Sequence, residues 1–385
     1  MRDLIEAMSI KYNNRVYEKK QRGEDVITLS FGEAYFDIPL FRFDDLPMPG
    51  LYHYSHSRGI MELRELLADY YESRFGVPVD PETELVVTAG SKIALHMAFM
   101  AVLEPGDEVL VPEPAWVSYP EQVRLCHGVP VRIPYHERVA DYRRYITPRT
   151  RAIVVNNPNN PTGHLVSAAE WRELHRLAEQ HDLYIISDEA YSDYVLEPGD
   201  FISAAAYDPE KKHTIVCNTL SKNYGMSGWR IGYVFTNEEM LFQILKLNQH
   251  LITCPATVLE WYVVRHFHEV LDITAPQIRD VVVKRRAVAR MVESMGLRVF
   301  PGAGTFYLFV SIEDSALGSE EFCDRLLDER GVSTVPGIGY GDSCDGFIRI
   351  SVGSESLERI RAGLEHIAEF IQETAPLMAP VAAAA

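Results

Sequence analysis

Residues 214–232 read TIVCNTLSKNYGMSGWRIG, the most informative stretch of this chain. It opens on the apolar and β-branched run 214–217, which is typical of a short buried strand. Lys222 then follows among hydroxyl residues and glycines, and Arg230 stands at the start of another apolar run. An isolated lysine is usually a solvated surface charge, but a solvated lysine does not explain the string as a whole.

Four more apolar runs lie upstream of that stretch and alternate with helical patterns, at 85–88, 108–111, 152–155 and 183–186. Near-continuous apolar strands are buried on both faces, so the pattern predicts an α/β fold with a mostly parallel sheet sandwiched by helices. Beyond Glu238 the pattern is helical to about Arg290, and 297–373 then mixes short strands with helices. This predicts a second, smaller α+β domain that is joined by a long helix.

The residues that follow each strand are the first candidates for ligand binding, because ligands of such folds bind beyond the carboxyl ends of the strands. The strand at 85–88 runs into Gly90, Ser91 and Lys92 at the start of a helical pattern. Free backbone N–H groups and the helix dipole would make a phosphate cradle there. A plain glycine turn with a serine N-cap is the simpler interpretation of this motif when it is taken alone.

Two further strand ends carry polar groups beside buried strands. The loop 156–163 reads NNPNNPTG, in which two prolines and a glycine fix the turn and present Asn160 rigidly. Asp188 lies just after the run 183–186, where a carboxylate is costly to desolvate unless it meets a cation or a strong donor. An ordinary polar loop and a helix N-cap would account for these two motifs separately.

The bulk composition narrows the classes of function. A chain of 385 residues suffices for roughly two domains and a deep site. Its 55 acidic and 37 basic residues give a net charge of −18, which argues against nucleic acid as a partner. Five scattered cysteines without a Cys-x-x-Cys pair favour a reducing cytoplasm and indicate neither a disulfide framework nor a metal site. The first 24 residues lack an uninterrupted apolar run, so neither a signal peptide nor a membrane span is expected.

From about Phe31 to Gly353 these motifs resemble, in order, the aspartate-aminotransferase-like (class I/II) family of fold type I pyridoxal phosphate enzymes. The resemblance implies an aminotransferase that moves an amino group between an amino acid and a 2-keto acid by a ping-pong mechanism. It also implies a seven-stranded type of sheet and a homodimer with shared active sites. The implied parts are an N-terminal segment packing with the small domain, a large cofactor-binding domain, a small domain and a tail, at 1–35, 36–280, 281–375 and 376–385.

The same resemblance implies roles for residues around the cofactor. Lys222 would hold pyridoxal phosphate as a Schiff base and act as the general base, while Asp188 would pair with the pyridine nitrogen. Asn160 and Tyr191 would donate to the ring oxygen, and Trp116 would stack on the ring, although a core tryptophan is its simpler interpretation. The phosphate would be surrounded by Tyr54, contributed across the dimer, and by Gly90, Ser91, Lys92, Thr219, Ser221 and Arg230.

For the substrate, the resemblance implies that Arg349 binds the α-carboxylate, with help from the Gly32 backbone and Asn160. On pattern alone, Arg349 could be a solvent-facing residue of an edge strand. Further candidates for the pocket are His53, Tyr54, His56 and Tyr307. Three departures from the family pattern border the entrance that selects substrates: Ala34 replaces a common proline, 37–53 is too short for the usual helix, and the connection 134–146 is abbreviated. The motifs therefore leave the substrate open, and an acidic donor such as glutamate is the default taken from the family.

Two alternatives stay open from the sequence. Relatives with this cofactor also perform β-elimination, as lyases, and motifs for the cofactor do not separate the two reactions. A nucleotide-dependent enzyme or a non-catalytic cofactor-binding regulator is a more distant alternative. No Gly-Lys pair is present for a P-loop, and Gly337–Asp342 lacks the final glycine of a dinucleotide fingerprint.

Overall fold

The computed structural model describes residues 4–39, 41–47 and 49–376. Its main feature is a seven-stranded sheet in the order β2-β8-β7-β6-β5-β3-β4. β8 runs antiparallel to β2 and β7, and the other pairs are parallel, so the predicted mostly parallel α/β sheet is confirmed. The strands are β2 (Leu85–Thr88), β3 (Glu108–Pro112), β4 (Val129–Ile133), β5 (Thr150–Asn156), β6 (Tyr184–Asp188), β7 (Thr214–Thr219) and β8 (Gly232–Phe235).

The five strands predicted from apolar runs are all present, and four of them extend beyond the predicted runs. β6 ends on Asp188 and β7 on Thr219, so these polar residues are the last residues of buried strands. β4 was not predicted, because it is a partly exposed edge strand that contains Pro130 and Arg132. The carboxyl ends of β5, β6 and β7 therefore meet at one edge of the sheet, as a parallel arrangement requires.

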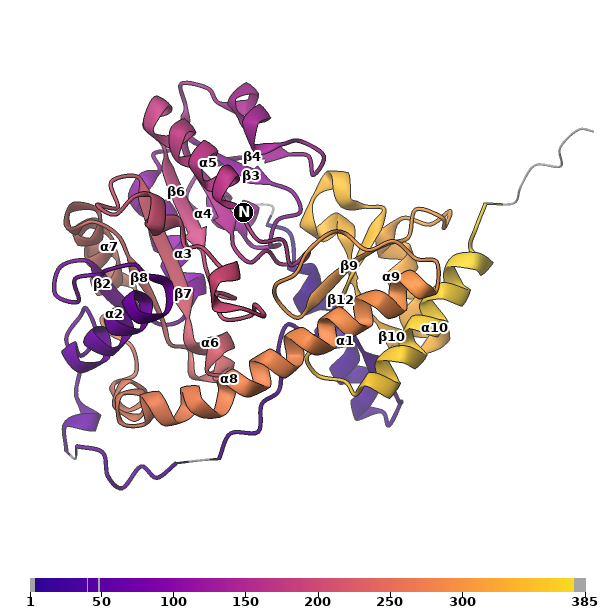
Figure 1. Cartoon of the computed structure of the whole chain (residues 1–385), viewed down its shortest axis with the longest axis horizontal. Helices are drawn as coiled ribbons and strands as arrows, with labels where there is room; N and C mark the ends of the chain where they lie inside the picture. The colour runs from indigo at the N-terminus through magenta and orange to yellow at the C-terminus, as the bar shows by residue number, and fades with distance from the viewer. Residues whose placement is uncertain (1–3, 40, 48, 377–385) are drawn as a thin grey trace, which may run out of the picture.

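Helices cover both faces of this sheet (Figure 1). One face packs against α3 (Ser91–Val102), α4 (Tyr119–Leu125) and α7 (Glu238–Leu251). The other face packs against α2 (Met61–Phe75), α5 (Ala168–His181) and the first part of α8. The central strands are mostly apolar because both faces of the sheet are covered.

A smaller part surrounds a second, antiparallel sheet of β11 (Val335–Pro336), β12 (Phe347–Ser351) and β9 (Tyr307–Ser311). It also contains the parallel pair β1 (Ile27–Thr28) and β10 (Val332–Ser333). Its helices are α1 (Met8–Gln21), α9 (Ser319–Arg330) and α10 (Leu357–Glu373). Because β1 pairs with β10, the chain between α1 and β1 lies with this part.

The long helix α8 (Thr257–Ser294) runs from the large sheet to the small one, as the sequence predicts (Figure 1). Its backbone departs from helical geometry at His266. The described residues of 37–53 hold only the short 3-10 turn Gly50–Tyr52, in agreement with the expected lack of a helix there. Residues 377–385 of the predicted tail lie outside the described residues, and no described helix is long and apolar enough to cross a membrane.

Candidate active site

A cavity of about 590 Å³ opens where the carboxyl ends of β5, β6 and β7 meet the start of α3, the chain after β1 and strand β12. Twelve of the residues predicted for the site line it. They are Gly32, Ser91, Lys92, Trp116, Asn160, Asp188, Tyr191, Thr219, Ser221, Lys222, Arg230 and Arg349. The cavity volume falls within the range of sites for small ligands and cofactors.

The start of α3 has the geometry of an anion site. Gly90, the residue before the helix, has φ +88, and a Cβ atom there would lie 2.4 Å from Nη2 of Arg230. Only glycine therefore lets the guanidinium approach the first free N–H groups of the helix. Arg230 also donates to Ser221 Oγ at 3.4 Å, and Ser221 Oγ accepts from Thr219 Oγ1 at 2.8 Å. Hydroxyls, a guanidinium and a helix N-terminus thus converge, which suits a phosphate group.

Lys92, in the first turn of α3, adds a second positive charge. Its Nζ atom lies 5.0 Å from the ring centroid of Trp116, and no carboxylate lies within 4.0 Å of it among the described residues. Burial and the nearby Arg230 guanidinium lower the pKa of Lys92 below its ordinary value. This corner of the cavity is thus positively charged without a balancing acid, and it requires an anion.

Asp188 is buried at the end of β6, and both of its carboxylate oxygens accept hydrogen bonds. Tyr119 Oη donates to Oδ2 at 2.6 Å, and the Ala190 backbone N–H donates to Oδ1 at 3.2 Å. Burial raises the pKa of Asp188 to about 6, and these two donors oppose the rise. An N-cap role for Asp188 is not seen, because no helix begins there. A buried carboxylate that lines a cavity suits a protonated ring nitrogen.

Lys222 reaches into the cavity from α6 (Leu220–Asn223) and does not point to solvent. Its Nζ donates to the backbone oxygen of Gly32 at 2.6 Å and lies 5.6 Å from the ring centroid of Tyr191. Burial lowers the pKa of Lys222 to about 8, while the charge of Glu33 acts in the opposite direction. A lysine with a pKa near 8 is neutral in an appreciable fraction at physiological pH, as a nucleophile or a base must be.

Arg349 is only 2% exposed, so its interpretation as a solvent-facing residue is wrong. Its guanidinium lies 4.3 Å from the ring centroid of Tyr307, and it donates to Ser30 O at 2.5 Å and to Asn160 Oδ1 at 3.4 Å. Its Nε atom is buried and has no hydrogen-bond partner among the described residues. A buried guanidinium that lines a cavity suits a carboxylate.

Tyr191 joins this group from the other side. Its hydroxyl lies 3.1 Å from that of Tyr307 and accepts from Asn160 Nδ2 at 3.5 Å. Tyr191 and Asn160 come from the ends of strands in the large sheet, whereas Tyr307 and Arg349 come from β9 and β12. The two halves of the structure therefore contact each other inside the cavity.

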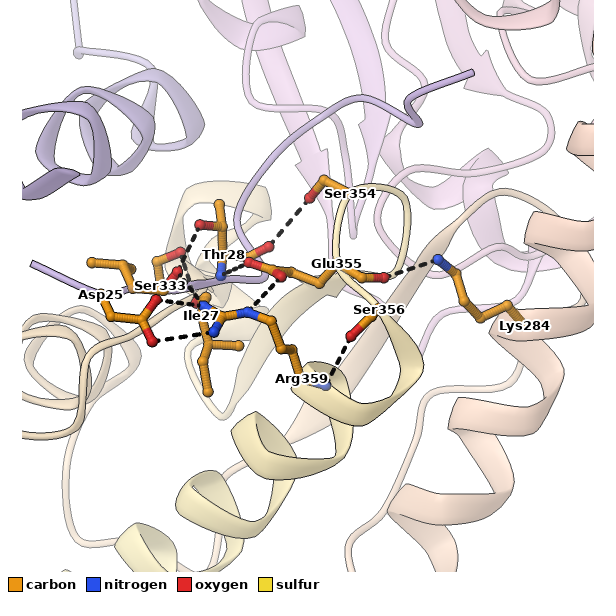
Figure 2. Close-up of polar contacts among 10 residues, drawn as sticks. Asp25, Ile27, Thr28, Lys284, Ser333, Ser354, Glu355, Ser356 and Arg359 are labelled. Carbon is orange, nitrogen blue, oxygen red and sulfur yellow. Dashed lines mark hydrogen bonds and ion pairs between the residues drawn. The ribbon is translucent and has the colours of Figure 1, made fainter. Parts of the chain in front are cut away.

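Strand β1 and Asp25, two residues before it, are held to α10 and the turn before that helix by a polar cluster (Figure 2). Glu355 accepts from the Thr28 backbone N–H at 2.8 Å, and Arg359 donates to Glu355 at 2.9 Å and to Asp25 at 2.8 Å. This cluster fixes β1, and the residues that follow it, up to Gly32, line the cavity. The Gly32 backbone is thus held by contacts well outside the site.

The sequence missed several residues of the cavity. Tyr119 was not assigned, because a tyrosine at the start of a helix is most often a core residue. Glu33 accepts a hydrogen bond from Ser227 Oγ at the cavity wall. Helix α1 was expected with the small part but not at the site, and it contributes Ser9, Ile10, Asn13 and Tyr17. The sequence of α1 mixes charged and apolar residues, and such a pattern does not indicate that a helix lines a cavity.

Of the further candidates for the pocket, Tyr307 lines the cavity, and His53, Tyr54 and His56 do not line it within this chain. Tyr54 is 85% exposed. Gly90 does not line the cavity directly, but it supports Arg230 as described above. The expected contacts of Tyr54 therefore require a second chain.

A family model described as aminotransferase class I and II matches residues 25–367. The aromatic-amino-acid aminotransferase 2 of Thermococcus litoralis is 31% identical over 382 residues, which covers 96% of this chain and 98% of the relative. The aspartate/prephenate aminotransferase of Thermus thermophilus is 35% identical over 380 residues, which covers 95% and 96%. The solved aspartate aminotransferase of Thermus thermophilus with maleate superposes with a TM-score of 0.86 at 33% identity, over 95% of this chain and 97% of that one.

Proposed function

The chain belongs to the class I and II aminotransferase family and is a pyridoxal-phosphate-dependent aminotransferase, and on this premise we propose how its own residues divide the work. Arg230, Ser91, Ser221, Thr219 and the N-terminus of α3 at Gly90 hold the phosphate. Asp188 would pair with the ring nitrogen, Asn160 and Tyr191 would donate to the ring oxygen, and Trp116 would stack on the ring. Lys222 would carry the covalent link. When bound, the cofactor supplies an electron sink for the charge left on the substrate's Cα atom.

The residues of the chain then bind the substrate and move one proton. Arg349 binds the α-carboxylate, and its buried position beside Tyr307 keeps the guanidinium plane fixed. The Gly32 backbone oxygen accepts a hydrogen bond from Lys222 Nζ. A substrate carboxylate bound beside Gly32 would therefore lie on the same side of the cavity as the Lys222 amine. Lys222, once released, takes the proton from Cα, because its lowered pKa leaves a neutral amine to accept it.

For the amino donor we propose an acid such as glutamate. The observation that carries this is the surplus of cations lining the cavity. Four cations line it, and three of them, Lys222, Arg230 and Arg349, already have roles. The acids that line it are Glu33 and Asp188. Lys92 is the remaining cation, and although the sequence motif suggests the phosphate, its position over Trp116 also suits the second carboxylate of the substrate.

A Lys92→Met variant tests this role. We expect its KM for glutamate to rise about tenfold or more, with KM for phenylalanine and the dissociation constant of the cofactor within about twofold of the parent. A matched Lys246→Met variant removes an exposed lysine of α7 and serves as control. If cofactor affinity falls while the ratio of the two KM values stays constant, Lys92 binds the phosphate instead, and the argument for an acidic donor is lost.

Incubation with one amino acid at a time distinguishes transamination from the competing β-elimination. Transamination converts the bound cofactor to pyridoxamine phosphate and yields one keto acid without a second substrate. A lyase would release ammonia and keep the original cofactor absorbance. Glutamate, aspartate and phenylalanine, each offered alone, are the donors to compare.

We further propose a homodimer in which Tyr54 reaches the phosphate site of the other chain. The support is the position of Tyr54, which is 85% exposed beside the 77% exposed Tyr52. Exposed aromatics at this density favour an interface over open solvent. Sedimentation would give the mass of two chains, and Tyr54→Phe would weaken cofactor binding about tenfold or more through the loss of one hydrogen bond to a charged group. A monomer with full activity contradicts the proposal.

The same family pattern supports two coarser proposals. The domain limits are 1–35, 36–280, 281–375 and 376–385, and the pairing of β1 with β10 supports the first limit. The cytoplasm is the proposed compartment, because all five cysteines are free thiols. Limited proteolysis that cuts inside 36–280 earlier than it cuts at the proposed boundaries would contradict the domain limits.

A further inference from the structure

Arg285, in the second half of α8, is a buried cation without an acidic partner. Its side chain is only 2% exposed, and no carboxylate lies within 4.0 Å of it among the described residues. Its guanidinium donates instead to backbone oxygens of three segments: Nε to Tyr307 at 2.8 Å, Nη1 to Gly302 at 2.7 Å and Nη2 to Thr162 at 2.9 Å. Burial of a charge without an acidic partner is costly. We therefore expect these three bonds to fix the relative positions of the three backbone segments, which an apolar side chain could not do.

The segments that Arg285 joins come from the two parts of the structure and touch through their backbones. The carbonyl oxygen of Gly163 accepts from the N–H groups of Ala303 and Gly304, both at 2.8 Å. A Cβ atom at Gly163 would lie 2.3 Å from the Gly304 oxygen and 2.7 Å from Nη2 of Arg285. Only glycine permits this approach, so the contact is set by backbone atoms and by the guanidinium rather than by adaptable side chains.

Each of these segments carries one side of the Arg349 site. Thr162 follows Asn160 by two residues in the same rigid loop, and Asn160 contacts Arg349. Tyr307 stacks on Arg349, and the Tyr307 backbone oxygen accepts from Arg285. Arg285 thus binds the backbones of the segments on both sides of the Arg349 guanidinium.

We propose that Arg285 is a positioning residue for substrate binding: it fixes the spacing between the Asn160 loop and β9, and thereby the orientation of Arg349 toward the substrate carboxylate. This inference rests on the proposed role of Arg349. The planar fork of arginine reaches three carbonyls at fixed angles, which a lysine cannot reproduce. A shift of about 1 Å in such a site costs on the order of a hundredfold in rate. Arg285 contacts no residue that is proposed to hold the phosphate.

The test compares Arg285→Met with Lys284→Met in the cofactor-loaded enzyme. Lys284 is the preceding residue of α8 and is partly buried, and among the described residues its Nζ bonds only to the Glu355 backbone oxygen, in the small part, at 3.1 Å (Figure 2). Each change removes one cation from the same helical turn, and only the first breaks the junction between the two parts. The readouts are the dissociation constant of maleate, a dicarboxylate that has no amino group to transfer, the dissociation constant of the cofactor, and KM and kcat for glutamate.

For Arg285→Met we expect maleate binding and KM for glutamate to weaken about tenfold or more, with cofactor affinity within about twofold of the parent. For Lys284→Met we expect all of these constants within about twofold. Amide hydrogen exchange at 303–304 should rise only in the Arg285 variant, because the bonds to Gly163 loosen. Arg285→Lys, which keeps the charge, should show the same loss of maleate binding with a smaller loss of thermal stability.

An Arg285→Lys enzyme that binds maleate as the parent does would overturn the inference, and this variant also decides the matter if Arg285→Met fails to fold. An equal loss in Lys284→Met would overturn it too, because the effect would then follow from general destabilisation of α8. Arg349→Gln separates this result from the proposed function. If Arg349→Gln also leaves maleate binding unchanged, the carboxylate role of Arg349 has failed, and the inference about Arg285 falls with it.

Discussion

The cofactor side of the cavity and its substrate side are built in different ways. The cofactor side, with Asp188, Lys222 and the start of α3, comes from the ends of three strands of one sheet, β6, β7 and β2. The substrate side joins Gly32, Tyr307 and Arg349, which come from three segments far apart in sequence. A strand end in a buried sheet is fixed by its neighbours, whereas the substrate side depends on the packing of one part of the chain against another. Cofactor binding and substrate binding should therefore respond separately to mutation.

Lys222→Ala is expected to have the largest effect, and it acts on the cofactor side. We expect the borohydride-reducible link to be lost and kcat to fall by about 10³-fold or more, because we propose that Lys222 provides both the link and the base. Mass spectrometry after borohydride reduction measures the link, and Lys246→Ala, an exposed lysine, is the control. A variant that still carries the reducible link would place the attachment on another lysine.

Arg349→Gln is expected to affect the substrate side alone. Loss of one partner of a buried charge pair costs about 2–5 kcal/mol, so KM for the amino donor should rise about a hundredfold while cofactor affinity stays unchanged. Arg349→Lys should recover only part of the loss, because a lysine cannot form the bidentate contact. Titration of the apoprotein with cofactor is the companion measurement. A large fall in cofactor affinity would show that the two sides are not independent.

Tyr119→Phe tests the cofactor side through Asp188. Without the hydroxyl, Asp188 loses its 2.6 Å donor, its pKa should rise further, and its charge should stabilise a ring nitrogen less well. A hydrogen bond to a charged group contributes about 1.5–3 kcal/mol, so we expect kcat to fall about tenfold or more, with KM changed less. Tyr70→Phe, which removes a tyrosine bond to Asp193 outside the cavity, is the matched control. Equal effects of the two variants would contradict a specific role for Tyr119.

The pH dependence of cofactor uptake tests the cofactor side without any substitution. Burial lowers the pKa of Lys222 to about 8, so the neutral, reactive amine gains population as pH rises toward 8 and saturates above it. The covalent uptake rate of the apoprotein should therefore rise up to about tenfold per pH unit below 8 and level off above. Rapid-mixing absorbance measurements from pH 6 to 10 give the profile. A rate that still climbs at pH 10 would indicate an ordinary solvent-exposed lysine.

Much of the fold and of the cofactor side could be predicted from sequence because the relevant signals are local. An apolar run followed by a polar residue marks both a buried strand and the ligand end of that strand, and Asp188 and Thr219 prove to be the last residues of β6 and β7. The edge strand β4 escaped prediction, because a half-exposed strand with Pro130 lacks the continuous apolar pattern. The bond from Tyr119 to Asp188 escaped it too, because it joins residues 69 positions apart.

The sequence by itself therefore determined the sheet and the lysine that enters the cavity, since both rest on patterns within a few residues of a strand end. Only the tertiary structure decided the rest. It showed that Arg349 is buried against Tyr307, that the Gly32 backbone faces Lys222, and that Arg285 ties the two parts together. The physical reason is that these contacts form where the two parts of the structure meet. The groups that offset the cost of burying each charge lie far apart in sequence, so no local pattern indicates them.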